Sequence, residues 1–308
     1  MQLADMEQIM NQAATLKQWK QFSSPKEGHN TYRNRKNSVN QGHPRVICFS
    51  SGKGGVGKTS IVTNLAIALS QKGKKVLILD ADLGLANVDV MLGLVPKYSI
   101  HHLFTGNKEL HDILIDGPGG IKLLPASSGI QEMVNLDESE KLFLLNEFDS
   151  LQMPLDIMLI DNAAGISDTV MYFNMAAQER VVVLTPEPTS ITDAYALIKV
   201  LVRTHKVNRF HIIINWVNSK QEAHRVFSQL ATVADKFLGI LSLNFLGFIP
   251  KDAAVPKSVR KQRAAVELFP ESRASRKMME LAENILNTEE SLTQDGNIKF
   301  FWKNLLGI

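Results

Sequence analysis

The chain has 308 residues, of which 44% are hydrophobic and 21% are charged, and its formal net charge is +3. This length suits one large domain with tails or two small domains, and a charge so close to balance indicates no strong preference for nucleic acid. The single cysteine, Cys48, excludes an internal disulfide, and neither a signal peptide nor an apolar run of roughly 18 residues is recognisable, so we expect a soluble or peripheral cytoplasmic protein.

The first 22 residues predict an amphipathic helix, because apolar side chains recur there at spacings of three and four. Residues 23–44 lack this periodicity and are rich in Ser, Asn, Gly, Lys and Arg, as in a flexible linker. A helix on such a linker has no neighbouring core to pack against. Its apolar stripe therefore favours docking to a partner over a structural role.

From Arg45 onward, short apolar runs alternate with helical patterns. This alternation predicts an α/β domain at residues 45–287, with a mostly parallel central sheet buried between helices and ligands at the carboxyl ends of its strands. One of its helices opens after Thr185, with Thr189 or Ser190 as the expected N-cap. The predicted strands are Val46–Phe49, Val76–Leu79, Ile157–Ile160, Val181–Leu184, Ile212–Ile214 and Phe245–Ile249, with a shorter one at Lys122–Pro125.

A glycine-rich loop follows the first strand and precedes a helical pattern at Ile61–Leu69. It fits the phosphate-binding template G-x-x-x-x-G-K-[ST] in the required order of strand, loop and helix. We expect Lys58 to reach the β- and γ-phosphates of a nucleotide and the Thr59 hydroxyl to bind Mg²⁺. Backbone N–H groups would hold the phosphates, and the glycines would allow conformations that a side chain obstructs. The expected nucleotide contacts are Gly52, Lys53, Gly54, Gly55, Val56, Gly57, Lys58, Thr59 and Ser60.

Acidic residues stand at the ends of two other predicted strands. Asp80 and Asp82 follow the second strand, and Asp161 follows the third long one. Carboxylates that face a phosphate loop suit metal coordination and the positioning of an attacking water, although Asp80 and Asp82 could instead cap the next helix. Gly165 would offer its backbone N–H to the γ-phosphate, since glycine permits a close approach and a change of backbone angle.

The last residues predict a second amphipathic helix, at residues 298–308, after a helical pattern at Ser275–Leu286 and a polar linker at 288–297. Its apolar stripe and two lysines suit an anionic lipid surface, with docking onto the domain as the alternative. One copy would bind marginally, whereas two copies on a dimer would gain avidity. The apolar positions are Ile298, Phe301, Trp302, Leu305 and Leu306.

The glycine-rich loop resembles the deviant Walker A box of the MinD/ParA class of ATPases, which carries an extra lysine at the position of Lys53. The resemblance implies that this lysine reaches across a dimer interface to the partner's nucleotide. It therefore implies a homodimer that forms around ATP and Mg²⁺. Lys53, Lys58 and Asp82 are the expected catalytic residues, of which the two lysines would oppose the negative charge that develops on the phosphates.

The segments after the second and third long strands are similar to switch I and switch II of the same class. This similarity assigns Asp80 to the metal side, Asp82 to the orientation of the nucleophilic water, and Asp161 to Mg²⁺ through water. Asn215 stands where the class reads the adenine base through a side-chain amide. Pro250 lies in a loop that resembles the one bordering the base.

Two further segments resemble the FlhG family within this class, also called FleN or YlxH. Glu187–Lys199 reads much like the corresponding run of FleN-type proteins, and an N-terminal run resembles their D-Q-A-x-x-L-R element, with Asn11 for Asp and Lys17 for Arg. The resemblance implies control of flagellar number and placement by a protein at the inner face of the plasma membrane, at the cell pole. We expect no direct contact with nucleic acid. It implies a FlhF-type GTPase partner, bound through Gln12 and Leu16, and a FleQ-type transcription factor as a second candidate.

Three other functions stay open. A MinD-type division-site regulator shares the ATPase and the tail but ordinarily begins almost directly at the phosphate loop. A ParA-type DNA partitioner would bind nonspecific DNA with a steep salt dependence and would lack the lipid-binding helix. A scaffold would bind nucleotide without hydrolysing it. Nitrogenase-like iron proteins share the fold but contribute two cysteines per chain to a cluster, where this chain has one.

Overall fold

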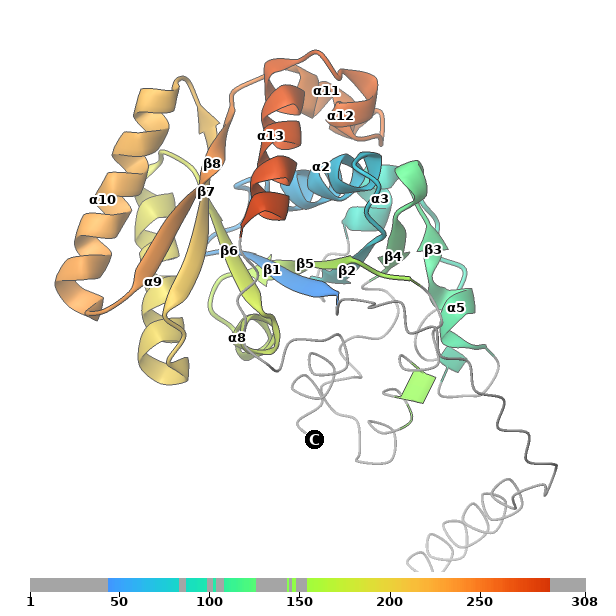
Figure 1. Cartoon of the computed structure of the whole chain (residues 1–308), viewed down its shortest axis with the longest axis horizontal. Helices are drawn as coiled ribbons and strands as arrows, with labels where there is room; N and C mark the ends of the chain where they lie inside the picture. Colours follow the sequence, from blue (N-terminus) through green and yellow to red (C-terminus); the bar gives the residue numbers. More distant parts are fainter. Residues whose placement is uncertain are drawn as a thin grey trace, which may run out of the picture. The chain divides into compact units, whose positions relative to one another are not determined.

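One twisted sheet organises the part of the chain that the computed structural model describes, which comprises residues 44–82, 87–98, 102–103, 108–125, 143, 146–147 and 154–288. In the described residues the sheet has eight strands in the order β3-β4-β2-β5-β1-β6-β7-β8 (Figure 1). Neighbouring strands are parallel except β3 and β4. The strands are β1 (Arg45–Ser51), β2 (Val76–Ala81), β3 (Ile115–Asp116), β4 (Lys122–Leu124), β5 (Ile157–Ala164), β6 (Glu179–Leu184), β7 (Arg209–Val217) and β8 (Ser242–Pro250).

The predicted parallel α/β architecture is therefore confirmed. The predicted helices at residues 1–22 and 298–308, with Gln12, Leu16 and the five apolar positions of the tail, lie outside the described residues. The short antiparallel strand β3 is an addition to the predicted set, because two residues are too few to show a periodic pattern.

Strands β1, β2 and β5 extend beyond their apolar runs. The carboxyl-terminal residues of these strands are polar but still pair: Phe49 lies opposite Asp161, and Asp80 lies opposite Asp161 on the other side. Apolar periodicity reports burial, whereas pairing continues as long as the backbone groups find partners. Asp80 is the second-last residue of β2, and Asp161 lies opposite it, three residues before β5 ends, so both stand towards the carboxyl ends of their strands.

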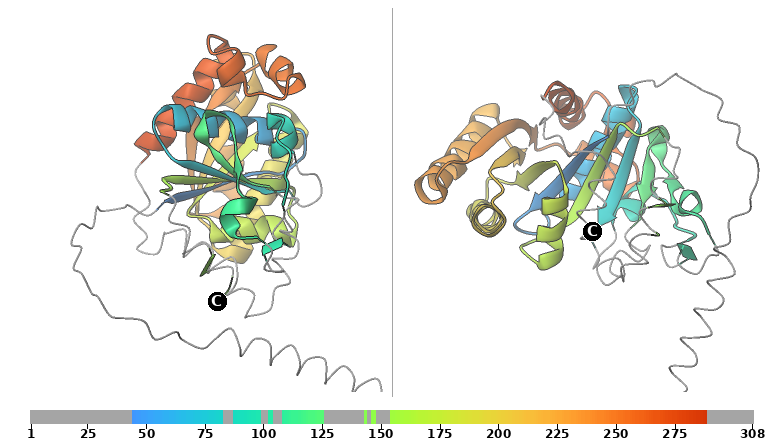
Figure 2. Two further views of the ribbon diagram at one scale, coloured as in Figure 1. Left: turned by 90° about the vertical axis from the view of Figure 1, so that its right-hand side faces the viewer. Right: turned by 60° about the horizontal axis from the view of Figure 1, so that its bottom comes forward.

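Helices cover both faces of the sheet (Figure 2). The strand side chains alternate between a core that includes α2 and α13 on one face and two cores that include α8, α9 and α10 on the other. Burial on both faces explains why the strands read as continuous apolar runs. The helices are α2 (Lys58–Gln71), α3 (Val88–Leu92), α5 (Leu110–Ile113), η1 (Pro118–Gly120), α8 (Asp168–Ala176), α9 (Pro188–His205), α10 (Lys220–Leu238), α11 (Ala254–Arg260), α12 (Ala265–Leu268) and α13 (Arg273–Asn287).

Helix α9 begins earlier than predicted. Pro188 is its first residue and Glu187 is its N-cap, so the prediction of Thr189 or Ser190 as the N-cap is wrong. Proline lacks a backbone N–H and has a fixed φ, which suits the first helical position. The hydroxyl of Ser190 instead accepts a hydrogen bond from the backbone N–H of Thr185, at 3.0 Å.

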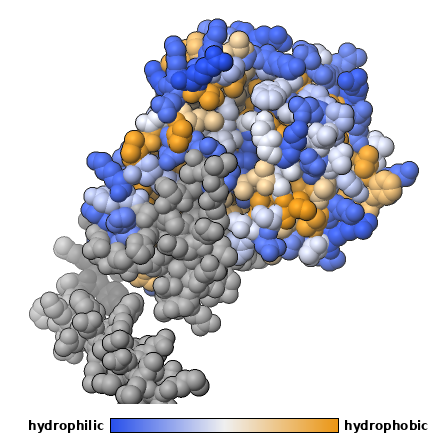
Figure 3. Space-filling model, turned by 180° about the vertical axis from the view of Figure 1, so that it is seen from behind, coloured by the Kyte–Doolittle hydropathy of each residue, from blue (hydrophilic) through white to orange (hydrophobic). Residues whose placement is uncertain are grey.

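On the face of the molecule that Figure 3 shows, small apolar patches lie between hydrophilic residues. The most exposed large apolar side chains of the described ranges include Ile240, fully exposed, and Phe237, 54% exposed, at the end of α10. Within the same ranges, the search for a helix that is both long enough and apolar enough to cross a bilayer finds none.

Candidate functional site

A pocket of about 1270 Å³ opens at the carboxyl edge of the sheet. Its wall includes the glycine-rich loop between β1 and α2, the ends of β7 and β8, and residues of α11. Of the predicted nucleotide contacts, residues 54–60, Asn215 and Pro250 line this pocket, and so does Asp82. The fold thus gathers residues that lie up to about 200 positions apart in the sequence around one cavity.

The glycines of the loop serve two different purposes. Gly57 has a left-handed backbone with φ of 87°, and a Cβ atom there would lie 2.5 Å from Nδ2 of Asn215. A Cβ atom at Gly52 would lie 2.1 Å from the carbonyl carbon of Asp193, in the first half of α9. Gly52 therefore allows close packing against a helix, and its backbone is not left-handed; its contact with a nucleotide stays a prediction.

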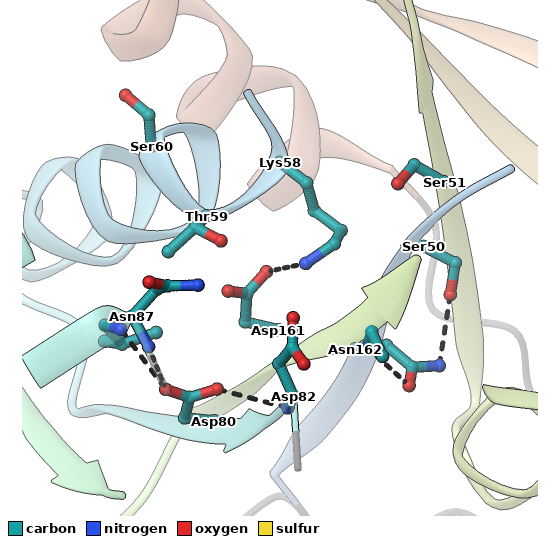
Figure 4. Close-up of polar contacts among 12 residues, drawn as sticks. Ser50, Ser51, Lys58, Thr59, Ser60, Asp80, Asp82, Asn87, Asp161 and Asn162 are labelled. Carbon is teal, nitrogen blue, oxygen red and sulfur yellow. Dashed lines mark hydrogen bonds and ion pairs between the residues drawn. The ribbon is translucent and has the colours of Figure 1, made fainter. Parts of the chain in front are cut away.

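Lys58 and Asp161 form an ion pair beneath the loop (Figure 4). Nζ of Lys58 donates to Oδ1 of Asp161 at 2.6 Å, and the two side chains are only 7% and 1% exposed. The lysine predicted to bind phosphate and the acid predicted to serve the metal therefore neutralise each other here. Two buried oxygens nearby, Oδ2 of Asp161 and Oγ of Ser60, have no hydrogen-bond partner in the described part of the chain.

Asp80 holds the chain that leads into α3. Its Oδ1 accepts the backbone N–H of Asp82 at 3.2 Å, and its Oδ2 accepts those of Asn87 and Val88 at 3.1 and 3.2 Å. These bonds tie Asp80 to the start of α3, whose N-cap is Asn87. Burial, and secondly the negative charge of Asp161, raise the pKa of Asp80 from 3.8 to about 7.

The oxygen atoms beside the ion pair fit a magnesium ion. The side chains of Thr59, Asp80, Asp82 and Asp161 face one another, whereas the Ser60 hydroxyl points away from them (Figure 4). Carboxylate and hydroxyl oxygens are the ligands that Mg²⁺ takes, and the unpartnered Oδ2 of Asp161 is a buried acceptor that such an ion would satisfy. Thr59, Asp80 and Asp161 are therefore suited to the metal, and Ser60 to a different part of the nucleotide.

Two predicted residues make contacts within the chain that differ from their predicted roles. Nζ of Lys53 donates to Oε2 of Glu187 at 2.7 Å and to Oγ1 of Thr189 at 3.2 Å, at the start of α9. The N–H of Gly165, where φ is 98°, donates to the carbonyl of Ser51 at 2.9 Å. Donation by Lys53 to a partner's nucleotide, or by Gly165 to a γ-phosphate, requires these bonds to break.

Asn215 links the end of β7 to the phosphate loop. Its Nδ2 donates to the carbonyl of Val56 at 2.7 Å, and its Oδ1 accepts the backbone N–H of Trp216 at 2.9 Å. A side-chain amide has two donors and two acceptor sites, so one of each is left for a ligand. Sequence reasoning missed Trp216, which lines the pocket and is 42% exposed. An aromatic residue next to an expected ligand at a strand end was the signal available.

A buried polar network that sequence reasoning also missed joins β5 to α8. Nδ2 of Asn162 lies 3.3 Å from Oγ of Ser50 and donates to the carbonyl of Val170 at 3.0 Å. Nδ2 of Asn174 donates to the same Ser50 oxygen, at 2.8 Å. Asn162, one residue after the predicted metal-binding Asp161, therefore helps to hold the carboxyl end of β5 in place.

Comparisons with known proteins agree with this site. The family of the "CobQ/CobB/MinD/ParA nucleotide binding domain" matches residues 47–266. The antiactivator FleN of Pseudomonas aeruginosa is 46% identical over 265 residues, which are 86% of this chain and 94% of that protein. The flagellum site-determining protein YlxH of Helicobacter pylori is 32% identical over 271 residues, 87% of this chain and 91% of that one. The septum site-determining protein MinD of Pyrococcus horikoshii, solved in complex with Mg-ADP, superposes with a TM-score of 0.62 at 25% identity, covering 79% of this chain and 96% of that chain.

Proposed function

Because this chain belongs to the CobQ/CobB/MinD/ParA family of nucleotide-binding proteins, and within it to the FlhG/FleN (YlxH) group of flagellar regulators, we propose that it is an ATP-dependent, dimerising ATPase that controls flagellar number and placement. The observation that carries the proposal is the glycine-rich loop that lines a pocket together with Lys58, whose ammonium is paired with the buried Asp161. The unpartnered oxygens of Asp161 and Ser60 support a site built for a ligand that is both anionic and metal-bound.

With Mg-ATP bound, Lys58 would leave Asp161 and direct its ammonium to the β- and γ-phosphates, and Asp161, Asp80 and the Thr59 hydroxyl would hold the metal. Bound Mg²⁺ supplies positive charge to the phosphate oxygens. Asp82, half-buried at the pocket wall, orients the attacking water, and Lys58 and Lys53 oppose the charge that develops during transfer.

Dimerisation depends on Lys53 in this proposal. Lys53 lies outside the pocket lining of its own chain, and its side chain is 34% exposed. Its bond to Glu187 is a partly exposed ion pair, and such pairs contribute only about 0 to 1 kcal/mol. Lys53 can therefore leave Glu187 at little cost and reach the nucleotide of a second copy, as the resemblance to MinD/ParA ATPases implies.

The segments outside the ATPase domain at residues 45–287 give the proposed protein its location and partners. Residues 298–308, joined by the linker 288–297, bind anionic lipid at the inner face of the plasma membrane, and pairing of two copies multiplies that weak attachment. Residues 1–22, on the linker 23–44, bind a FlhF-type GTPase through Gln12 and Leu16, and a FleQ-type transcription factor is a second candidate partner.

The catalytic part of the proposal is tested with Asp82→Ala in the full chain. We expect the variant to lose ATP hydrolysis but to keep ATP-dependent dimers on anionic liposomes. The reason is that Asp82 orients the attacking water and does not contribute to the binding of ATP. Asp235→Ala, which removes an exposed acid from α10, is the matched control and should hydrolyse ATP normally. Loss of the dimers together with hydrolysis would contradict the role of Asp82, and a wild-type chain that stays monomeric with non-hydrolysable ATP would contradict the proposed function.

The membrane part is tested with Trp302→Glu. A charge in the middle of the apolar stripe should release the protein from liposomes while ATP binding stays intact. Ile240→Glu places the same charge at a fully exposed apolar position of the domain and should not affect sedimentation with liposomes. Unchanged sedimentation of the Trp302 variant would refute the tail assignment.

The rival functions are separated by their partners. The full chain is tested for binding to a FlhF-type GTPase and to a FleQ-type factor, with and without ATP. Binding to either protein, and loss of GTPase binding in the Gln12→Ala variant, would support the flagellar assignment. Absence of GTPase binding would favour a MinD-type division-site regulator. Retention on nonspecific DNA with no liposome binding would favour a ParA-type partitioner.

A further inference from the structure

Trp216 stands at a break in the pairing between β7 and β8. Asn215 pairs with Ile249 and Val217 pairs with Pro250, so the ladder passes over Trp216. The backbone of Trp216 is left-handed, with φ of 60°. This conformation is an outlier for a bulky side chain and strains the backbone, so its presence in a well-packed sheet calls for a reason.

The break turns the indole away from the core. Ile212 and Ile214 pack in the core that includes α9 and α10, whereas Ile213 packs in the core on the opposite face. Regular alternation would send residue 216 to the same side as Ile212 and Ile214. Val217 takes that place instead, fully buried, because one extra residue in a strand shifts every later side chain to the other face.

The side chain released in this way lines the nucleotide pocket. Trp216 is 42% exposed and shares the pocket wall with Pro250 and with the phosphate loop. The position of Trp216 depends on that loop. The backbone N–H of Trp216 donates to Oδ1 of Asn215, and Nδ2 of Asn215 donates to the carbonyl of Val56 in the loop. A large aromatic face is thus presented in a cavity whose other wall is an anion-binding loop.

We propose that Trp216 stacks on the base of the bound nucleotide and is a principal source of affinity for that base. The inference rests on the proposed function, because it assigns a binding residue to the same pocket. Stacking of a base on an aromatic side chain suits every purine, since each has a flat π face. Trp216 therefore strengthens the binding of ATP and GTP alike. Discrimination between the two bases comes from hydrogen bonds of other groups, such as the Asn215 amide.

The first test compares nucleotides with inorganic tripolyphosphate, which engages the phosphate loop but has no base. Trp216→Ala in the full chain should bind ATP roughly 5- to 100-fold more weakly, the loss expected for one stacked base, while tripolyphosphate affinity is unchanged. Trp216→Phe should restore most of the affinity. Phe237→Ala removes an aromatic side chain of comparable exposure on α10 and should bind ATP as the wild type does.

The second test needs no loss-of-binding variant. The chain has three tryptophans, so a double variant with Trp19→Phe and Trp302→Phe contains Trp216 as its single tryptophan. ATP should quench or shift its emission, and tripolyphosphate should not. This measurement keeps the inference falsifiable if Trp216→Ala fails to fold.

The outcomes separate this inference from the function on which it rests. The stacking role would be overturned if Trp216→Ala and the wild type bound ATP with equal affinity, or if ATP did not change the fluorescence emission of Trp216. Either result would leave the ATPase assignment intact. An equal loss of ATP and tripolyphosphate affinity would also overturn it, because the change would then act on the phosphate loop. A wild-type chain that binds neither ligand would instead overturn the proposed function itself.

Discussion

Two buried ion pairs lie at opposite ends of the parallel strands, one at the amino ends (the amino edge) and one at the carboxyl ends (the carboxyl edge). They differ in how many of their polar atoms have a hydrogen-bond partner. At the amino edge, Arg45 begins β1 and Glu179 begins β6, and Nε and Nη2 of Arg45 donate to the two carboxylate oxygens at 2.8 and 2.9 Å. Nη1 of Arg45 donates to the carbonyl of Ile285 in α13, at 2.8 Å. At the carboxyl edge, Lys58 bonds only one oxygen of Asp161 in the described structure, and the other oxygen is buried without a partner.

The difference separates a structural pair from a functional one. Both pairs are buried, since none of the four side chains is more than 10% exposed. A buried charge is tolerated when each of its polar atoms has a hydrogen-bond partner, as the three guanidinium nitrogens of Arg45 do, and is costly when one of them has none. The unfilled capacity at Asp161, and the raised pKa of its neighbour Asp80, are what a site prepared for an external cation and phosphate retains.

The largest effect is expected from Arg45→Ala. The substitution removes the guanidinium partner of the buried Glu179 and an anchor of α13, so the free energy of unfolding should fall by about 3 to 5 kcal/mol. ATP affinity should be unchanged in the fraction that stays folded, because the pair lies at the edge opposite the pocket. Urea unfolding, with ATP titration below the transition, measures both. A loss of ATP affinity in the folded protein would show that the two edges are not independent.

The next effect concerns Asp80 in the metal-free protein. Its pKa is about 7 in the folded chain and 3.8 in the reference state, so between these values the folded state holds a proton that the unfolded chain has lost. This carboxyl therefore lowers the free energy of unfolding as the pH rises from about 4 to 7, by on the order of 4 kcal/mol. Carboxyl ¹³C titration in EDTA should show one resonance with a midpoint near 7 that is absent in Asp80→Asn. If every carboxyl titrates below about pH 5, the burial argument fails.

Lys58→Ala is the carboxyl-edge counterpart of the Arg45 substitution. It also leaves a buried acid without its partner and so lowers stability, but it should in addition weaken the binding of ATP. Loss of a charge-assisted contact to phosphate is worth about 1.5 to 3 kcal/mol, so ATP affinity should fall roughly 10- to 100-fold. Isothermal titration of Lys58→Ala and Arg45→Ala side by side gives the comparison. Equal ATP affinities in the two variants would remove the distinction drawn between the pairs.

The smallest effect belongs to His211, which faces the amino-edge pair. Burial, and secondly the charges of Arg209 and Arg45, lower its pKa below 6.5, although Glu179 lies 3.9 Å from its Nε2. Burial prevails because Arg45 already occupies that carboxylate. As the pH falls below about 6.5, the unfolded chain gains a proton here before the folded chain does, so stability decreases. His211→Gln should therefore reduce the loss of stability between pH 8 and pH 5, which urea unfolding at the two pH values measures.

Much of the fold could be predicted because local patterns report burial. The runs at Val46–Phe49 and Val181–Leu184 are apolar throughout since helices cover both faces of β1 and β6. Prediction failed where a local preference competed with a neighbour: Ser190 is a good N-cap residue, but Pro188 sets the start of α9. No local pattern indicated that the missing side chain of Gly52 also makes room for α9.

The sequence by itself determined the parallel sheet, the position of the phosphate loop and the residue types that surround it, because periodicity and a short motif are local properties. Only the tertiary structure decided which charges meet. Lys58 and Asp161 are 103 positions apart, and Trp216 enters the pocket through one extra residue in β7. Strand order and register bring such residues together, and both depend on packing across the whole sheet, which no local pattern encodes.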